Sequence, residues 1–393
     1  MNKKYQKCFN YIERSWAGFV FKTKHDIGIH LALPNKFISP NAELFAKDQF
    51  YWDSYFIILG LVVSGRQKLA RGMVDNLVYL FNRFGFIPAR NLFPSIAVSQ
   101  PPFLTSMILE VFSSLPNKKW LAQVAEAAEG ELANYWKDGG YRAKSGCPVH
   151  LVKHGLSRYA GYYRSNLVAE YESGWDETSR FGGKCLEFAS VDLNSLLYKY
   201  EIDLSEIYEL LGKKEKAKSF MIAAKQRKTA MTKFFWNEKK GFFFDYNKDK
   251  KEQSDFWSLA GFYPLFVKLA TKEQAEVMVK NLKKFEFAGG LANTANQKLY
   301  KDFKQWDYPN GWPNQQWIVL KGLLNYGYEK EARRLAIKWL DLNLAIFKET
   351  GFLWEKYDVV KKTIGQSDMR YETQSGFGWT NGVFLKLVKE FLE

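Results

Sequence analysis

The sequence predicts an all-α fold in which pairs of helices close into an (α/α)6 barrel, or toroid, with a small β-hairpin in one loop. Apolar residues recur at spacings of three and four along most of the 393 residues. The helical stretches come in pairs joined by short turns. An open helical solenoid would repeat at a fixed period, and the sequence shows no such repeat. Strand signals are short and lie between the helices.

The elements follow from this periodicity in chain order. Helices are expected at 55–65, 67–84, 104–112, 119–136, 191–211, 214–235, 256–269, 272–283, 314–326, 329–347 and 376–392. The aromatic run GFFFDY at 241–246 predicts the small hairpin. Longer loops separate the helix pairs at about 34–52, 85–103, 138–180, 285–313 and 348–376. Because long loops on an ordered scaffold commonly carry function, we expect the functional site there.

Length and composition predict a single catalytic domain, 1–393, with residues 1–30 partly peripheral. Hydrophobic residues make up 47% of the chain, and no linker-like tract interrupts it. The net charge is +15, but the lysines are scattered among acids, so no nucleic-acid partner is expected. No signal peptide or membrane-spanning run is evident, and we expect a cytoplasmic monomer that does not bind membranes. Cys8, Cys147 and Cys185 have no metal or redox spacing and predict no disulfide framework.

Tryptophan stands beside acids or amides at several junctions between a loop and a helix. These clusters are 51–56 (YWDSYF), 172–176 (ESGWD), 305–312 (QWDYPNGW), 354–358 (WEKYD) and 375–382 (SGFGWTNG). An indole face can stack on the apolar C–H face of a sugar, whose hydroxyls need acid and amide partners. Two carboxyl groups on either side of a glycosidic bond can also hydrolyse it. The clusters therefore predict a glycoside hydrolase.

Two acids are candidates for that chemistry. Asp176 follows Trp175 in a glycine-containing loop, where an adjacent apolar ring would raise the pKa of its carboxyl and favour the protonated form that a general acid needs. Asp176 could equally cap a helix that begins before Phe181. Glu355 could activate water as a general base, or it could be a surface residue paired with Lys356.

Further polar residues in these clusters are candidates for binding sugar hydroxyls. Asp53 and Asp307 each follow a tryptophan, although Asp53 could also cap the helix that begins near it. The amides that could join them are Gln305, Asn310, Gln100 and Asn91. The glycines at 376, 378 and 382 either let the backbone approach a ligand or only shape the turn before the last helix.

His150 and His154 have the spacing of a zinc-binding pair on one face of a helix. The glutamate of the metalloprotease motif is missing, Pro148 interrupts the segment, and no third ligand is evident. We therefore expect no metal and no cofactor.

The motifs resemble those of the trehalases of glycoside hydrolase family 37. Residues 305–312 look like the second signature of that family, and 172–176, 355–359 and 376–383 are similar to its other segments. Residues 50–56, 99–103 and 191–194 match in the same order, so the resemblance runs from about residue 40 to the C-terminus. It implies an (α/α)6 barrel that inverts the anomeric centre, with Asp176 as general acid and Glu355 as general base. The residues then expected to bind substrate are Trp52, Asp53, Asn91, Gln100, Arg158, Trp175, Gln305, Trp306, Asp307, Asn310, Trp312, Glu372 and Trp379.

The chain departs from the family pattern at several positions. Phe45 and Val98 stand where the family has arginines, whereas a third family arginine corresponds to Arg158. Arg370 stands where the family has an acid, with Glu372 close by. A site that loses hydrogen-bond donors is expected to discriminate differently among substrates.

Taken with this resemblance, the residue clusters imply an inverting α-glycosidase that hydrolyses trehalose to glucose, with its two catalytic carboxyl groups about 6.5–9.5 Å apart. One alternative is a related inverting hydrolase of another small α-glycoside, such as glucosylglycerate or mannosylglycerate. A second alternative, from a different class, is a catalytically silent sugar-binding protein.

Overall fold

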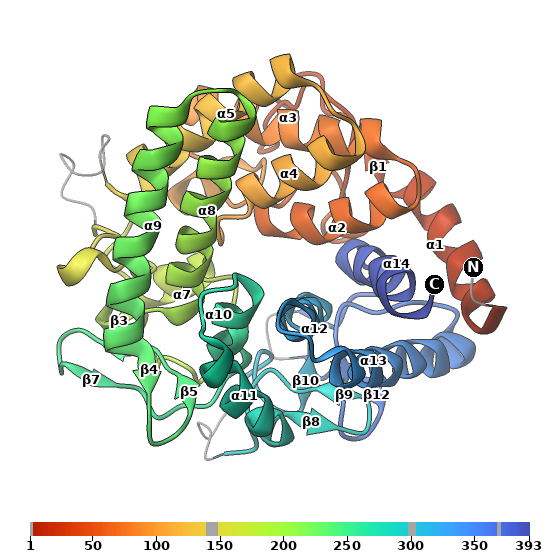
Figure 1. The fold of residues 1–393 in the computed structure, drawn as a ribbon. Coiled ribbons are helices and arrows are strands. Elements are labelled where there is room, and N and C mark those ends of the chain that lie inside the picture. Colours follow the sequence, from red (N-terminus) through yellow and green to blue (C-terminus); the bar gives the residue numbers. More distant parts are fainter. Residues whose placement is uncertain (1–2, 139–147, 298–303, 368–370) are drawn as a thin grey trace.

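The computed structural model describes residues 3–138, 148–297, 304–367 and 371–393. In this part of the chain, helices form two layers around a common axis (Figure 1). The inner layer consists of α2 (Tyr51–Val63), α4 (Leu104–Ser114), α8 (Val191–Leu210), α10 (Tyr263–Phe266), α12 (Pro313–Asn325) and α14 (Gly378–Leu392). Each of these helices contacts the next, and α14 closes the ring against α2. The predicted (α/α)6 barrel is therefore confirmed.

The outer layer covers this ring. It consists of α1 (Gln6–Gly18), α3 (Gln67–Phe84), α5 (Lys118–Glu131), α9 (Lys214–Phe235), α11 (Lys272–Lys280) and α13 (Glu329–Thr350). Helices α3, α5, α9, α11 and α13 each follow an inner helix and return along the outside of the barrel, as Figure 1 shows. The inner helices consequently run in the same direction, and their N-termini meet at one end of the barrel.

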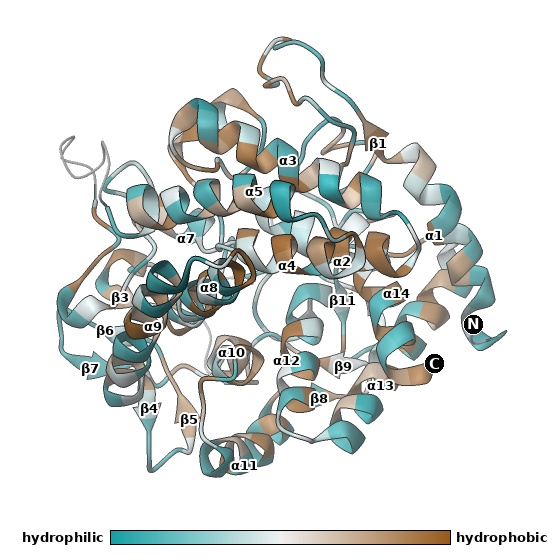
Figure 2. Cartoon of the chain, turned by 45° about the horizontal axis from the view of Figure 1, so that its top comes forward, coloured by the Kyte–Doolittle hydropathy of each residue, from teal (hydrophilic) through white to brown (hydrophobic). Residues whose placement is uncertain are grey.

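The two layers differ in hydropathy as their positions require. Residues Tyr51 to Leu61 of α2 are all buried, so an apolar side chain is suited to nearly every face of that helix. Helix α9 buries only a narrow stripe and exposes most of its lysines. Figure 2 shows the contrast as brown along α2 and teal along much of α9.

Three segments differ from the expected helices. The predicted helix at 256–269 is a 3-10 turn (Leu259–Phe262) followed by the single turn α10, and Lys268 has a φ of +56°, which ends the helical geometry. Helix α2 begins at Tyr51, so Trp52 and Asp53 lie in its first turn. The short helix α7 (Asn166–Glu172) was not predicted, because its seven residues are too few to show periodicity.

Small antiparallel sheets stabilise the loops. The strands are β1 (Val20–Phe21), β2 (Phe37–Ile38), β3 (Phe188–Ala189), β4 (Trp236–Asn237), β5 (Phe242–Phe243), β6 (Tyr246–Asn247), β7 (Glu252–Gln253), β8 (Glu286–Phe287), β9 (Gly290–Leu291), β10 (Asn310–Gly311), β11 (Tyr357–Asp358) and β12 (Thr363–Ile364). The segment at 241–246 supplies β5, which pairs with β4, and the start of β6, which pairs with β3 and β7. In the sheet β10–β11–β12, Asn310 lies opposite Asp358 and Gly311 opposite Tyr357, which joins two of the tryptophan clusters.

The N-terminal segment, expected to be partly peripheral, divides into two parts. Helix α1 packs against α14 and buries Cys8, Ile12 and Trp16, whereas residues 24–29 are exposed. Cys8 and Cys185 are buried free thiols, and Cys147 lies outside the described residues. In the ranges that the structure describes, no helix has the length and apolar character needed to cross a bilayer.

Candidate active site

A cavity of about 380 Å³ lies at the end of the barrel where the inner helices begin. Most of the residues expected at the site line it, namely Trp52, Asp53, Gln100, Asp176, Gln305, Trp306, Trp312, Glu355 and Trp379. They come from the first turns of α2 and α14, from the N-cap of α12, and from loops that lead toward these helices. The helix N-termini carry partial positive charge, which suits a site rich in carboxylates and sugar hydroxyls.

Among the residues that the structure describes, three carboxyl groups line this cavity, those of Asp53, Asp176 and Glu355. Asp176 and Glu355, which are remote in sequence, therefore meet at one site. Burial raises the pKa of Asp53 well above its ordinary value, and the negative charges of Glu355 and Asp176 raise it further. The protonated form of Asp53 is consequently favoured, and it can donate a hydrogen bond as well as accept one.

Glu355 is 2% exposed and is held from both sides. The Lys356 ammonium donates to its Oε2 at 2.7 Å, and the Tyr371 hydroxyl donates to its Oε1 at 2.8 Å. Its backbone N–H donates to the carbonyl of Gln374 at 2.9 Å. Glu355 does pair with Lys356, but the pair is buried and is not the surface pair that the local sequence allowed.

Asp176 is half-buried and lies in the loop after α7. The Gln305 side chain donates to the backbone carbonyl of Asp176 at 3.2 Å. Just beyond, the Thr178 hydroxyl and the Ser179 N–H donate to the carboxyl of Asp307 at 3.0 and 3.1 Å. Asp307 thus fixes the loop that carries Asp176, and burial raises the pKa of Asp307 to about 6.

The tryptophans predicted from sequence form one network, here called the indole cluster: Trp52, Trp175, Trp306, Trp312 and Trp379. Trp306 and Trp312 stack with ring centroids 4.1 Å apart and planes 6° apart. Trp175 lies behind them, with its centroid 5.3 Å from that of Trp306. The cluster gives one side of the cavity a rigid aromatic wall suited to the C–H face of a sugar.

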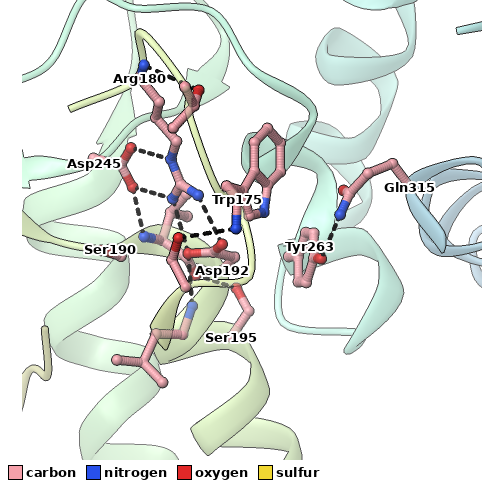
Figure 3. A network of polar contacts seen from close by, with 12 residues as sticks. Trp175, Arg180, Ser190, Asp192, Ser195, Asp245, Tyr263 and Gln315 are labelled. Atoms are coloured by element: carbon pink, nitrogen blue, oxygen red, sulfur yellow. Dashed lines mark hydrogen bonds and ion pairs between the residues drawn. The ribbon is translucent and has the colours of Figure 1, made fainter. Parts of the chain in front are cut away.

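Trp175 is fixed from behind by a buried ionic network (Figure 3). The Arg180 guanidinium lies 5.1 Å from the Trp175 ring centroid. It also forms ion pairs with Asp192 and Asp245, each at 2.7 Å, and all three of these charged side chains are buried. Arg180 was not predicted from the sequence, because a buried pairing between distant segments leaves no local motif.

Six residues expected at the site do not line the cavity. They are Asn91, Arg158, Trp175, Asp307, Asn310 and Glu372. Asn91 accepts from the N–H of Gln49, and its amide N–H groups donate to backbone carbonyls. Asn310 similarly donates to the carbonyls of Gln305 and Gln366. These two asparagines thus organise the loops of the site.

Two charged residues of this set lie in different surroundings. The Arg158 guanidinium donates to the carbonyls of Val149 and Leu186, at 3.0 and 2.6 Å. Glu372 is exposed. Arg370, which occupies the acidic position of the family, lies outside the described residues.

His150 and His154 do not come together. His150 is fully buried between the carboxyl groups of Asp138 and Glu172, at 3.2 and 3.0 Å. His154 has a φ of +66° and stacks on Phe234. The two histidines therefore do not share a helix face.

The final glycine run serves helix packing. A Cβ on Gly382 would lie 2.2 Å from the carbonyl oxygen of Phe56, and one on Gly378 would lie 3.1 Å from Ile57. Gly376 has a φ of +65°, which favours glycine. The φ of Gly376 agrees with the turn expected before the last helix, whereas the packing of Gly378 and Gly382 against α2 was not among the two interpretations of this run.

Several residues at the cavity were not among those predicted from the sequence. Arg90, Tyr171 and Tyr371 line it, together with the apolar side chains of Phe45 and Val98. The Arg90 guanidinium donates to Asp48 at 2.8 Å and to the Ser95 hydroxyl at 3.1 Å, and it lies 5.0 Å from the Phe50 ring centroid. Its position just before Asn91 in a long loop was the available signal.

The chain is similar in sequence to known trehalases. The family model described as trehalase matches residues 4–166 and 158–392. The cytosolic neutral trehalase of Saccharomyces cerevisiae is 32% identical over 85% of this chain and 54% of its own length. The periplasmic trehalase of Xanthomonas campestris pv. campestris is 33% identical over 96% of this chain and 72% of its own.

The fold agrees with that likeness. The structure of neutral trehalase Nth1 from Saccharomyces cerevisiae superimposes with a TM-score of 0.78 and 30% identity, covering 90% of this chain and 73% of that one. The chain thus spans about half the length of its yeast relative and about three quarters of the bacterial one. By sequence and by fold, the chain belongs to the trehalase family.

Proposed function

We propose that this chain hydrolyses trehalose to two glucose molecules with inversion at the attacked carbon. Asp176 protonates the glycosidic oxygen as the bond to the anomeric carbon breaks. Glu355 accepts a proton from the water that attacks the opposite face of the sugar. The water oxygen forms the new bond, and both products leave as neutral sugars.

The observation that carries this proposal is that Asp176 and Glu355 line one cavity, beside the indole cluster. The indole cluster would stack on the ring under attack, while Asp53, Gln100 and Gln305 are placed to bind its hydroxyls. The relatives named as trehalases support trehalose as the substrate.

The charges at the cavity favour a neutral leaving group over a glycerate. Asp53, Asp176 and Glu355 already contribute three carboxyl groups. Arg90 is the arginine in its described lining, and an ion pair with Asp48 offsets its charge. A carboxylate on the leaving group would add negative charge, and the described lining residues offer no free cation to meet it.

Proton NMR of the first products tests the proposal. An inverting enzyme releases α- and β-glucose in equal amounts from trehalose, whereas a retaining enzyme releases only the α-anomer before mutarotation. Asp176→Asn and Glu355→Gln should each lower kcat by about a hundredfold or more. Glu252→Gln, at an exposed position, serves as the control. Near-wild-type turnover by either site variant, or α-glucose alone, would refute the mechanism.

Calorimetry with trehalose separates the sugar-binding alternative. A protein that binds trehalose without releasing glucose would be a silent binder rather than an enzyme.

We also propose that residues 1–393 form one domain and that the protein acts as a cytoplasmic monomer. Light scattering tests whether the protein is a monomer. Cell fractionation tests its compartment, since the relatives include both a cytosolic and a periplasmic trehalase.

A further inference from the structure

Lys356 is a fully buried lysine whose ammonium lies beside a carboxylate of the cavity. Its side chain is 0% exposed, and its Nζ lies 2.7 Å from Glu355 Oε2. The same Nζ lies 4.8 Å from the Trp312 ring centroid and 5.1 Å from that of Tyr371. A buried ammonium is retained only where a carboxylate and other electron-rich groups offset its lost hydration.

The backbone around Lys356 leaves its side chain little freedom. A Cβ on Gly365 would lie 2.8 Å from the carbonyl and the Cγ of Lys356, so β12 ends directly against this residue. The Gly365 N–H donates to the Lys356 carbonyl at 3.0 Å. The next residue, Tyr357 of β11, pairs with Gly311 of β10. The backbone contacts with β10 and β12 therefore hold the Lys356 ammonium beside Glu355.

A positive charge beside Glu355 matters because several carboxyl groups share the cavity and their negative charges repel one another. Among the described residues, the Lys356 ammonium and the Tyr371 hydroxyl contact the Glu355 carboxylate, and the carboxyl groups of Asp53 and Asp176 share its cavity, with Arg90 elsewhere on the cavity wall. Like charges in one enclosed site do not all ionise together. The carboxyl group nearest a cation retains its negative charge most readily.

We propose that Lys356 is a positioning residue that assigns the negative charge of the cavity to Glu355 and orients that carboxylate, with Tyr371, for deprotonating water. Lys356 itself is absent from the cavity lining, so it acts through Glu355 and does not touch the sugar. Its ion pair and the Tyr371 hydrogen bond each engage one carboxylate oxygen. The remaining lone pairs of that carboxylate stay available for water.

This inference rests on the proposed function in one respect, which is that Glu355 is the general base. The experiment therefore uses α-D-glucosyl fluoride beside trehalose. Fluoride departs without protonation, so the hydrolysis of this substrate depends on the base and not on Asp176. Asp176→Asn should hydrolyse the fluoride far better than it hydrolyses trehalose. A wild-type protein that hydrolyses the fluoride but not trehalose would refute the proposed substrate and leave the role of Lys356 testable.

The variants are Lys356→Met, which keeps the length of the side chain without its charge, and Tyr371→Phe, which removes one donor with less disturbance. Lys361→Met is the matched control, because Lys361 is exposed in the turn between β11 and β12. The readout is kcat/KM for the fluoride as a function of pH. Circular dichroism confirms that each variant folds.

Removing the cation takes away the ion pair that favours the charged form of the Glu355 carboxyl group, so the acid limb of the profile should move to higher pH. We expect a shift of about one pH unit or more for Lys356→Met, and a smaller shift in the same direction for Tyr371→Phe. At neutral pH, kcat should fall more than KM rises, since no contact with the sugar is lost. The control should keep the wild-type profile.

An unshifted acid limb in a folded Lys356→Met variant would overturn the proposal. If that variant does not fold, an unshifted limb in Tyr371→Phe would do the same. A wild-type protein inactive on both substrates would overturn this inference together with the proposed function. A merely structural lysine would lower the amount of folded enzyme and leave its pH profile in place.

Discussion

The Arg180 guanidinium lies 5.1 Å from the ring centroid of Trp175, the residue that directly precedes Asp176. Asp192 of α8 and Asp245, which precedes β6, hold that guanidinium through ion pairs (Figure 3). Trp175 is thereby fixed between Arg180 and Trp306. The position of the candidate general acid therefore depends on a charge network outside the cavity.

Replacing Arg180 with methionine should destabilise the protein strongly. The change leaves two buried carboxylates without a cation, which costs about 3–5 kcal/mol of unfolding free energy. Urea denaturation followed by tryptophan fluorescence measures this. The matched control is Arg66→Met, whose ion pair with Glu13 is partly exposed, and its effect should stay below about 1 kcal/mol. Equal losses for the two variants would contradict the buried network.

The sequence predicted the barrel because long amphipathic helices repeat their apolar residues clearly. It predicted that Asp176, Glu355 and the tryptophans of the indole cluster belong to one site, because tryptophan, acid and glycine gather in short runs. It could not separate the residues that line the cavity from those behind it. Asn91 and Asn310 lie in the same motifs as cavity residues, yet their amides hydrogen-bond to loop backbone.

Long-range pairings explain most of what the sequence left open. Arg180 meets Asp245 only after the chain has passed through α8 and α9. The interpretation of Glu355 also depended on burial, since a Glu–Lys neighbour pair looks the same in sequence whether it is exposed or enclosed. Lys356 is enclosed because Trp312, from a distant segment, lies against it.

Arg90 should determine how well the leaving glucose binds. Arg90 lies on the cavity wall beside Phe50 and Ser95. Asp53 belongs to the other part of the cavity, because the charges of Glu355 and Asp176 raise its pKa. We therefore expect Arg90 to donate to hydroxyls of the second sugar, and Arg90→Gln should raise KM for trehalose about tenfold to a hundredfold.

Glucosyl fluoride provides the internal control for Arg90, because its leaving group has no hydroxyls. Steady-state kinetics of Arg90→Gln on the two substrates should show a loss confined to trehalose. An equal loss on both would place Arg90 at the ring under attack, and no loss on either would remove it from substrate binding.

Glu170 should make stability depend on pH. Burial raises its pKa to about 7, and the charges of Glu177 and Asp176 contribute to the rise. Because the folded protein holds this proton more tightly than the unfolded chain, its contribution is complete below about pH 4.5 and is lost as pH rises to about 7. The loss is on the order of 3 kcal/mol.

Glu170→Gln should flatten that dependence, since glutamine stays neutral and its oxygen can still accept from the Thr178 N–H. Unfolding free energies measured from pH 4.5 to 8 test this. Glu252→Gln, at an exposed position, should keep the wild-type slope. If the slope of Glu170→Gln matched that of the wild type, Glu170 would not hold its proton in the folded state.

Gly382 should be intolerant of even one added methyl group, because it forms the seam where the barrel closes. A Cβ there would lie 2.2 Å from the carbonyl oxygen of Phe56, and a Cβ on Gly60 would lie 2.4 Å from the Cα of Gly382. Gly382→Ala must therefore push α14 away from α2, at a cost of at least about 2 kcal/mol. Gly18→Ala is the control, since nothing lies within 4 Å of its added Cβ.

The same separation would disturb the site, because Trp379 of α14 meets Trp52 of α2 with ring centroids 6.0 Å apart. Gly382→Ala should consequently lower both the melting temperature and kcat/KM, whereas Gly18→Ala should leave both near wild type or stabilise its helix slightly. Calorimetry and kinetics on one preparation measure the two effects. A Gly382→Ala variant with unchanged stability would mean that α2 and α14 do not approach as closely as these contacts require.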